Sequence, residues 1–314
     1  MKNLHLIVLL IALSFISLSV GASNINLLSI LYEYDEAALI MLTSRIPRLI
    51  SLIIASISLS ISGLIFQQIS RNKFVSPSTA STLDGAKFGL AVAFAFFGGT
   101  SLLTKTLISF TFSLASTSVF MAITRRIRSK GAVYIPLIGL MLGTFLNSTT
   151  VFISYHFDII QSITAWFYGD FSKVIKGRYE MLYLTLPLVV LTYLYINKFT
   201  IVSMGRDFSS NLGISYNRVV NLGLIIISLL SATTVIIVGN IPFVGLIIPN
   251  IVSLYMGDNL KKNIVKVSLI APIFLIASDI LGRVVRYPYE LPIGLVVGVL
   301  GSVIFLYLIG REQI

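Results

Sequence analysis

The chain of 314 residues contains no cysteine and only two histidines, His5 and His156. Without cysteine it cannot form a disulfide framework, a thiolate metal site or a thiol redox centre. The two histidines lie far apart in sequence and cannot form a metal-binding cluster by themselves. We therefore expect the chain to bind no metal ion and no cofactor of its own.

Charged residues are also scarce. Asp, Glu, Lys and Arg make up 11% of the chain, against about a quarter of an ordinary soluble domain. So little charge excludes a soluble globular protein, a disordered chain and a coiled coil. The 23 basic and 12 acidic residues give a net charge of +11, but no basic stripe is interleaved with aromatic side chains. We expect no nucleic acid partner, because cationic loops that face anionic lipid explain the excess.

Hydrophobic residues are abundant, at 56% of the chain, and they occur in long continuous runs. Such runs differ from the alternating segments of an outer-membrane barrel. A bilayer span needs about 20 apolar residues, so this supply suffices for about ten spans. The sequence therefore predicts an all-α membrane protein, with one polytopic domain over residues 1–314. The segments are 4–22, 48–69, 78–98, 101–123, 132–153, 180–196, 219–239, 243–256, 264–282 and 291–309.

The first segment has two interpretations. Lys2 and the small residues that end at Ala22 would suit a cleavable signal peptide, but the apolar run exceeds the length of about 7–15 residues that is usual there. A retained span is therefore favoured. With a cytoplasmic N-terminus and alternating spans, the inner loops carry the larger share of the basic residues, as the positive-inside rule requires. Both termini are then predicted to be cytoplasmic.

The polar loop between the sixth and seventh segments predicts a short helix. Asp207 can cap this helix, Gly213 can end it in a left-handed conformation, and Phe208 and Leu212 share one face. This apolar pair is either a docking surface for a soluble partner or the face of a helix that lies on the membrane.

The segment 239–250 is apolar but contains two glycines and two prolines: Gly239, Pro242, Gly245 and Pro249. These residues break a helix, and broken backbone at membrane depth survives only where protein surrounds it or it lines a cavity. Residues 72–77 repeat its order of Asn, Phe-Val and Pro. In the expected topology the two stretches follow spans of opposite direction, which predicts an inverted repeat of spans 2–5 and 7–10.

Basic residues also occur on the expected outer side. Arg45 and Arg48 precede the second span, and Arg286 lies before the last one. These arginines can anchor to lipid headgroups or pair with carboxylates of an external protein. Within the ninth segment, Asp279 and Arg283 stand about one turn apart and predict an intrahelical ion pair.

Motifs of phosphate binding and hydrolysis are missing. The chain has no G-x-x-x-x-G-K-[ST], no H-E-x-x-H and no G-x-S-x-G. This excludes a P-loop nucleotide site and the familiar hydrolases of membranes. We therefore expect no enzymatic activity in this chain.

Several motifs together carry a resemblance to a known family. They are R-I-P-R at 45–48, S-G at 62–63, Q-Q at 67–68, R-N-K-F-V-S-P at 71–77, W-F-Y-G-D-F at 166–171, G-N-I-P-F-V-G-L-I-I-P at 239–249 and E-L-P-I-G at 290–294. With these motifs nearly the whole chain resembles the FecCD/BtuC-type permeases, the membrane subunits of type II ABC importers for iron-siderophores, haem and cobalamin. It is most similar to the Gram-positive ferric siderophore permeases of the petrobactin type. One departure is Asn250, which stands where many relatives carry histidine.

The resemblance implies a ten-helix subunit that carries iron-siderophore complexes, of catecholate or petrobactin type, across the cytoplasmic membrane. It also implies a second permease, a paralogue in preference to an identical copy, together with two cytoplasmic ATPase subunits and an external substrate-binding lipoprotein. Arg45, Arg48 and Arg286 would meet acidic residues of the lipoprotein. The ATPases would dock on the loop that contains Gly205, Arg206, Asp207, Phe208, Leu212 and Gly213.

The translocation path is expected to be wide and lined by small polar groups. Asn147, Ser148, Thr149 and Thr150 in the fifth segment are candidates for this lining, and packing against neighbouring helices explains such a run equally well. The alternative function is an ion-coupled secondary transporter of a small solute. That function would need several buried ionisable residues along the path, and the single residue Asp279 is too few.

Overall fold

The structure is a computed structural model, and it describes residues 3–21, 38–99, 101–126 and 134–312. Within these residues every long element is an α-helix, and the β-type pairing is one isolated bridge between Tyr168 and Asn240. The described part also contains a π-helical turn, η2 (Met41–Arg45), and two 3-10 helices, η3 (Phe171–Lys173) and η4 (Tyr179–Leu184). The α-helices are α1 (Asn3–Ser19), α3 (Ile46–Ser70), α4 (Thr82–Phe97), α5 (Leu102–Arg126), α6 (Tyr134–His156), α7 (Ile160–Phe167), α8 (Thr185–Met204), α9 (Arg206–Asn211), α10 (Tyr216–Val238), α11 (Val244–Met256), α12 (Leu260–Val284) and α13 (Ile293–Glu312).

The expected apolar segments coincide with helices, the segment 180–196 with η4 and α8 together, and the prediction of an all-α membrane protein is confirmed. In the described residues, seven helical stretches are long and apolar enough to span a bilayer. Helices α1, α4 and α11 are shorter, at 17, 16 and 13 residues, so the number of ten spans stays a prediction. Lys2 and Ala22 lie outside the described residues, and retention of the first segment likewise stays a prediction.

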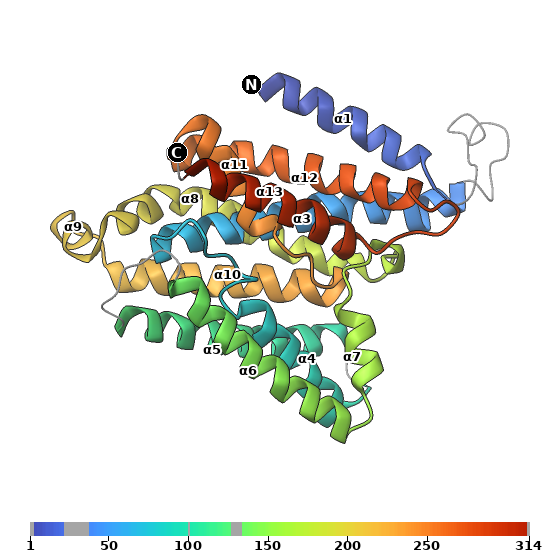
Figure 1. Cartoon of the computed structure of the whole chain (residues 1–314), viewed down its shortest axis with the longest axis horizontal. Coiled ribbons are helices and arrows are strands. Elements are labelled where there is room, and N and C mark those ends of the chain that lie inside the picture. Colours follow the sequence, from blue (N-terminus) through green and yellow to red (C-terminus); the bar gives the residue numbers. More distant parts are fainter. Residues whose placement is uncertain (1–2, 22–37, 100, 127–133, 313–314) are drawn as a thin grey trace.

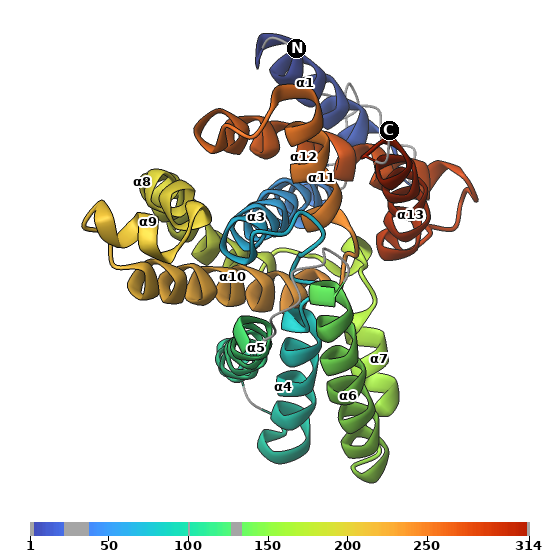
Figure 2. The same cartoon turned by 60° about the vertical axis from the view of Figure 1, so that its left-hand side comes forward.

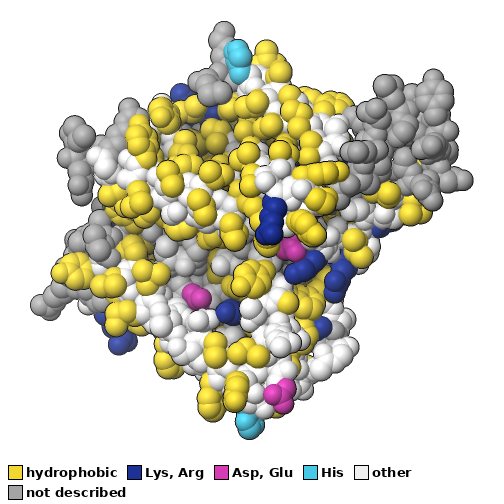
Figure 3. Space-filling view, turned by 45° about the vertical axis from the view of Figure 1, so that its right-hand side comes forward, with side chains coloured by type: hydrophobic (Ala, Val, Ile, Leu, Met, Phe, Trp, Pro, Cys, Tyr) yellow, Lys and Arg dark blue, Asp and Glu magenta, His cyan; other side chains and the backbone are white. Residues whose placement is uncertain are grey.

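Helices α3 and α10 form the centre of the molecule and run in opposite directions (Figure 1). Their most apolar stretches are 78% and 72% buried, whereas those of α6 and α13 are only 22% buried. The space-filling view in Figure 3 shows hydrophobic side chains over most of the surface, with basic side chains gathered in a few places. Such an apolar exterior fits a bundle that lies in lipid or against other helices.

The packing repeats itself around the central pair. Helix α3 packs against α11 and α12, as α10 packs against α4 and α5. Helix α4 contacts α5 and α6, as α11 contacts α12 and α13. Figure 2 shows these two groups of three helices on opposite sides of α3 and α10. This pattern, with α3 to α6 equivalent to α10 to α13, agrees with the expected inverted repeat of spans 2–5 and 7–10.

Glycines allow the closest helix contacts. Helices α3 and α11 meet where Gly63 faces Gly245, and a Cβ atom on Gly63 would overlap the carbonyl oxygen of Gly245. Gly85 and Gly89 likewise allow α4 to pack closely against the backbone of α5. In lipid, helices gain no hydrophobic drive to associate, so close backbone packing supplies much of their attraction.

Candidate functional site

The predicted break in the segment 239–250 lies between α10 and α11. Helix α10 ends at Val238, and α11 begins at Val244 after Phe243, which has a φ of +65°. Gly239 has a φ of +79°, and a Cβ atom there would also overlap the carbonyl of Tyr168. Glycine is therefore required at this position by its backbone conformation and by the close approach of another segment.

The expectation that Gly245 and Pro249 also break the helix is wrong, because both lie inside α11. Proline costs a helix the hydrogen bond to the carbonyl four residues earlier, which here belongs to Gly245. That carbonyl oxygen faces Gly63 at the crossing of α3 and α11. The helix continues through Pro249, and only residues 239–243 interrupt it.

The interrupted backbone is held by the segment that follows α7. The N–H of Asn240 donates to the carbonyl of Phe167 at 3.0 Å, and the N–H of Asp170 donates to the carbonyl of Val238 at 3.0 Å. The N–H of Gly294 at the start of α13 donates to the carbonyl of Gly169 at 3.0 Å. Three motifs that are separate in sequence thus form one junction, and their hydrogen bonds satisfy backbone groups that the break leaves without helical partners.

A second interruption separates α3 from α4. It begins at Arg71, with a φ of +53°, and ends at Ser81, with a φ of +58°. The side-chain amide of Asn250 donates to the carbonyl of Lys73 at 2.9 Å. Asn250, the departure from the histidine of many relatives, therefore connects α11 to this second interruption.

Lys73 also connects the second interruption to the turn between α11 and α12. Its ammonium lies 3.3 Å from the carboxylate of Asp258. A hydrogen bond from the hydroxyl of Ser253, and then the charge of Lys73, hold the pKa of Asp258 below its usual value. Both Lys73 and Asp258 are largely exposed, so this ion pair contributes little to stability.

A buried charge cluster joins α3, α12 and the loop before α13. The guanidinium of Arg48 lies 2.8 Å from Asp279 and 2.7 Å from Glu290. Arg283 contacts the other oxygen of Asp279 at 2.6 Å, which confirms the predicted intrahelical pair. The Asp279 side chain is 2% exposed, and the two positive charges of the cluster balance the two negative ones. Such mutual pairing is what allows charges to persist at membrane depth.

Two arginines bind the end of α1. Arg45 Nη1 donates to the carbonyl of Leu18 at 2.6 Å, and Arg283 Nη1 donates to the carbonyl of Ser17 at 2.8 Å. The last carbonyls of a helix lack intrahelical donors and carry the negative end of the helix dipole. The guanidinium groups satisfy these carbonyls and fix α1 to α12 and to the start of α3.

These contacts bear on the three arginines predicted to dock an external protein. Arg45 and Arg48 are engaged within the chain, and Arg45 is buried. Arg286 is exposed, and its guanidinium lies 5.9 Å from the centre of the Tyr289 ring. The docking role of all three stays a prediction, and Arg286 is the one whose charge lies at the surface.

Helix α9 lies at one end of the molecule between α8 and α10 (Figure 1). The expected capping role of Asp207 is wrong, because Gly205 occupies the N-cap position at a φ of +124° and Asp207 follows in the first turn. The chain needs glycine at the sharp turn out of α8, since other residues rarely adopt that φ. Gly213 has a φ of +72°, so the predicted left-handed end is confirmed.

The two faces of α9 differ. Phe208 and Leu212 are 46% and 55% exposed, which suits both a docking surface and a helix face that lies on the membrane. On the opposite face Ser209 is buried, and its hydroxyl contacts the carbonyls of Gly205 and Ile201 at 2.6 and 3.2 Å. Because Ile201 belongs to α8, α9 is attached firmly to that helix while its apolar pair stays open.

A cavity of about 770 Å³ adjoins α9. It lies between the end of α3, the end of α5, the start of α6 and the start of α10. Its charged lining residues are Arg71, Lys73, Arg125, Arg206 and Asp207. The cavity is therefore basic, and it lies beside the exposed apolar pair.

The polar run in α6 does not share one face. Asn147 accepts a hydrogen bond from the Lys87 ammonium at 2.8 Å, and Thr150 is buried. Ser148 is exposed and Thr149 is half-buried. Successive residues of a helix are separated by about 100°, so four of them must surround most of it. The lining role stays a prediction, and Ser148 is the residue that faces outward.

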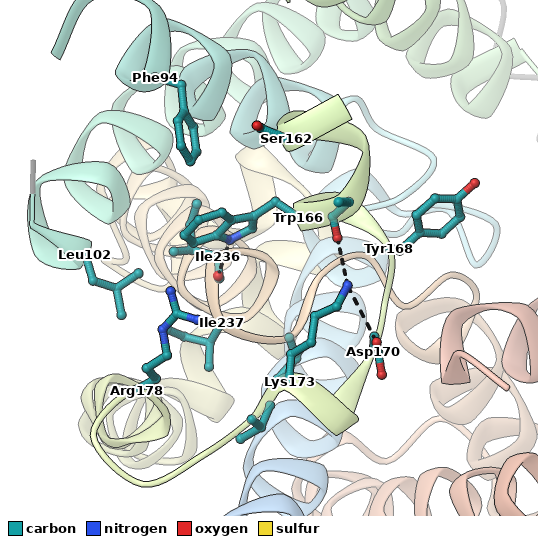
Figure 4. Close-up of a pocket in the computed structure, with 13 residues that line it drawn as sticks. Phe94, Leu102, Ser162, Trp166, Tyr168, Asp170, Lys173, Arg178, Ile236 and Ile237 are labelled. Carbon is teal, nitrogen blue, oxygen red and sulfur yellow. Dashed lines mark hydrogen bonds and ion pairs between the residues drawn. The ribbon is translucent and has the colours of Figure 1, made fainter. Parts of the chain in front are cut away.

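A pocket that the sequence did not predict lies beside Trp166, at the end of the bundle opposite α9. It has a volume of about 340 Å³. Figure 4 shows Trp166 of α7 between Phe94, Ile236 and the guanidinium of Arg178. The signal in the sequence was the single tryptophan followed by Lys173 and Arg178, but only the fold adds α4, α5 and α10 to them.

The junction, the charge cluster and the attached helix α9 can be compared with known proteins. The sequence pattern of the FecCD transport family matches residues 8–311. The chain belongs to this family. As a FecCD family member with seven membrane-length helices in its described part, it is a multi-pass protein of the cell membrane and a transport component, not an enzyme.

Two relatives illustrate the breadth of the family. The chain is 49% identical over 313 residues to the petrobactin import system permease protein YclN of Bacillus subtilis, with 100% of this chain and 99% of the relative covered. It is 42% identical to the ferric-anguibactin transport system permease protein FatD of Vibrio anguillarum, with 92% of each chain covered.

A solved structure shares the fold of this FecCD protein. A metal-chelate type ABC transporter in an inward-facing conformation matches with a TM-score of 0.84 at 22% identity, covering 98% of each chain. The PsaBC structure from Streptococcus pneumoniae matches more loosely, with a TM-score of 0.62 at 14% identity over 90% of this chain and 93% of the other. At these identities the likeness establishes the fold.

Proposed function

We propose that this FecCD protein is the membrane-spanning permease subunit of an ABC importer for a ferric siderophore of the petrobactin type. The observation that carries the proposal is the full-length 49% identity to a protein named as a petrobactin import permease. The relative named for ferric anguibactin supports the broader class of siderophore cargo. The iron chelate is the cargo of this chain and not its cofactor.

The end of the molecule that carries α9 is assigned to the cytoplasm. Basic residues gather there around the 770 Å³ cavity, and basic loops favour the cytoplasmic side. Helix α1 begins, and α13 ends, on the side of each helix that is nearer to α9 in Figure 1, in accord with cytoplasmic termini. Two ATPase subunits would bind here, with Phe208 and Leu212 as their apolar contact.

The attachment of α9 explains how ATP could drive the bundle. When ATP binding closes the two ATPases, their docking surfaces move, and α9 moves with them. Because the hydroxyl of Ser209 bonds α9 to Ile201 of α8, this movement passes to a long helix of the bundle. Rigid-body motion of helices then opens the path alternately to the two sides.

A second permease would cover the open faces of α6 and α13. Both helices lie on the right-hand side of Figure 2, and both expose large apolar side chains, including Phe145 and Phe152 of α6 and Val299 and Val303 of α13. Ser148 lies on the same open face of α6. We propose that the path runs between two permeases, and that the second one is a paralogue.

The substrate-binding lipoprotein would dock at the opposite end of the molecule. Arg286 offers an exposed charge there, and Arg48 lies deeper, paired with Glu290. Carboxylates on the lipoprotein would form charge-assisted hydrogen bonds with these guanidinium groups. Glu290 is 25% exposed, so a docking carboxylate could replace it on Arg48 without exposing the inner pair of Asp279 and Arg283.

The ion-coupled alternative is not supported. A coupling carboxylate must bind and release a cation or proton in each cycle. Asp279 is held between two arginines at 2.8 and 2.6 Å, and these contacts join α3 to α12. Asp279 therefore stabilises the fold and is not the carboxylate of an ion-coupling cycle.

Reconstitution tests the proposal. The chain should be placed in proteoliposomes with its candidate paralogue, ATPase and lipoprotein, and uptake of iron-labelled ferric petrobactin measured with and without ATP. We expect uptake only when all partners and ATP are present, and weaker uptake of a hydroxamate chelate. Uptake by the chain alone on an ion gradient would reject the importer, and ATP-driven uptake of an unrelated solute in its place would reject the cargo.

A further inference from the structure

The pocket beside Trp166 is built from helix ends. Phe94 lies near the end of α4, Leu102 begins α5, and Ile236 to Val238 end α10. These apolar residues form one part of the lining of the 340 Å³ cavity, and the segment from Ser162 to Arg178 supplies the rest. Because several membrane helices end there, the pocket lies at the depth where hydrocarbon gives way to headgroups and water.

Cations surround the aromatic part of the pocket. The Lys105 ammonium lies 4.4 Å from the ring centre of Phe94 and 5.2 Å from that of Trp166. The guanidinium of Arg178 lies 5.6 Å from the Trp166 ring. The indole N–H donates to the carbonyl of Ile236 at 2.7 Å, which fixes the ring in place. Figure 4 shows Arg178 directed toward this indole.

The pocket has more positive charge than the described residues neutralise. Lys173 pairs with Asp170 at 3.6 Å and donates to the carbonyl of Ala165. Among the described residues, no carboxylate forms an ion pair with Lys105 or Arg178. Two cations that flank an apolar cavity therefore offer a site for an external anion.

The surroundings of the pocket point to lipid. Leu103 and Leu107 of α5 are exposed on one side, and Leu184 and Leu186 are exposed near the start of α8 on the other. Both α5 and α8 pack against α10, whose residue Ile236 next to the pocket is buried. An acyl chain can lie against the exposed leucines of α5 and α8 while its headgroup reaches the cations.

We propose that Lys105, Arg178 and Trp166 form a binding site for the phosphate of an anionic phospholipid. The tryptophan supplies the amphipathic ring that is favoured at the membrane interface, and the two cations supply the attraction for an anionic headgroup. The apolar floor receives the adjoining part of the acyl chains. An acidic segment of a partner protein would match the cations, but it would not explain the leucines that flank them.

The site is linked to the junction at Gly239. Trp166 bonds the end of α10, and the residues that follow it bond Asn240 and Gly294. A lipid bound to Trp166 and Arg178 would therefore brace the segment that surrounds the interrupted backbone. We expect anionic lipid to raise the thermal stability of the chain, independently of its cargo and partners.

Lipid retention tests the site directly. The full chain in detergent is titrated with phosphatidylglycerol or phosphatidylcholine, and bound lipid is counted by native mass spectrometry. The double variant Lys105→Gln with Arg178→Gln should weaken phosphatidylglycerol binding at least about tenfold and leave phosphatidylcholine binding unchanged. The matched control, Lys198→Gln with Lys261→Gln, removes the same charge from residues that do not line the pocket and should bind as the unmodified chain does.

Three outcomes would overturn the proposal. In the first, phosphatidylglycerol binds equally well to the double variant and to the control. In the second, inorganic phosphate alone displaces the lipid and raises the melting temperature as much as the lipid does. The double variant could instead keep its lipid and lose affinity for the lipoprotein, which would make the pocket a protein contact. If the double variant fails to fold, phosphatidylglycerol binding is measured on the single variant Arg178→Gln, which should be weakened. Arg178→Lys, which keeps the charge, should retain most of the binding.

Discussion

At the scale of single residues, Asp279 has the largest structural role among the charged groups. It holds Arg48 of α3 and Arg283 of its own helix, and Arg283 in turn binds the carbonyl of Ser17. One buried carboxylate therefore connects α1, α3 and α12. Breaking such a cluster is costly because the remaining charges stay buried without compensation.

We expect Asp279→Asn to destabilise the chain by about 3 kcal/mol, since Arg48 and Arg283 would then share only Glu290. Thermal unfolding in detergent would measure the loss. The exposed Asp158→Asn variant is the control and should unfold as the unmodified chain does. Equal stability of the two variants would show that the cluster contributes no net stability.

Arg286 differs from the other two predicted docking arginines because its side chain is at the surface. We expect Arg286→Glu to weaken binding of the lipoprotein about tenfold or more, since an attractive contact becomes a repulsive one. The melting temperature of the chain should not change. Surface-plasmon measurements with the reconstituted permease would show the effect, and an unaltered affinity would remove Arg286 from the docking surface.

At the scale of elements, α9 combines a fixed face with an open face. Ser209 bonds it to α8, while Phe208 and Leu212 are free to contact a partner. A helix of six residues is too short to be stable alone, so its structure depends on this bond and on the glycines at both ends. Its open face can therefore be altered without loss of the helix.

We expect Leu212→Asp to abolish coupling between ATP hydrolysis and uptake, because a charge in an apolar contact remains unpaired on docking. ATP hydrolysis and uptake should be measured in the same proteoliposomes. Ser210→Ala, on the exposed part of the same helix, is the control and should transport normally. If Leu212→Asp also transports at the normal rate, α9 is not the contact that transmits motion.

At the scale of the whole molecule, the inverted repeat places two interruptions near the central helices. Residues 71–81 follow α3, and residues 239–243 follow α10. Asn250 connects α11 to the interruption at residues 71–81. The α9 end and the Trp166 end then face opposite sides of the membrane.

The absence of cysteine allows the orientation to be tested simply. We expect Leu212→Cys to react with a membrane-impermeant maleimide only after cells are permeabilised, and Tyr168→Cys to react in intact cells. Both side chains are well exposed in the structure, and the unmodified chain has no thiol to react. Labelling of Leu212→Cys in intact cells would show that the true topology is the inverse of the assigned one.

Local patterns were sufficient for much of the fold. The apolar runs predict the helices, the spacing of Asp279 and Arg283 predicts their ion pair, and Gly213 predicts the end of α9. Each of these features depends on residues within about two turns of one another. The wrong assignments were also local: Gly205 caps α9 in place of Asp207, and Pro249 continues α11, because neighbouring backbone decided both positions.

The sequence by itself determined that this chain is a helical membrane protein and which stretches form its long helices, since composition and short-range spacing control both. The tertiary structure alone decided which distant groups meet. Arg48 finds Asp279 231 residues away, Gly169 meets Asn240 and Gly294, and Lys105 and Arg178 converge on Trp166. The physical reason is that a buried charge or an interrupted backbone needs a partner, and only the packing of the whole bundle selects which segment provides it.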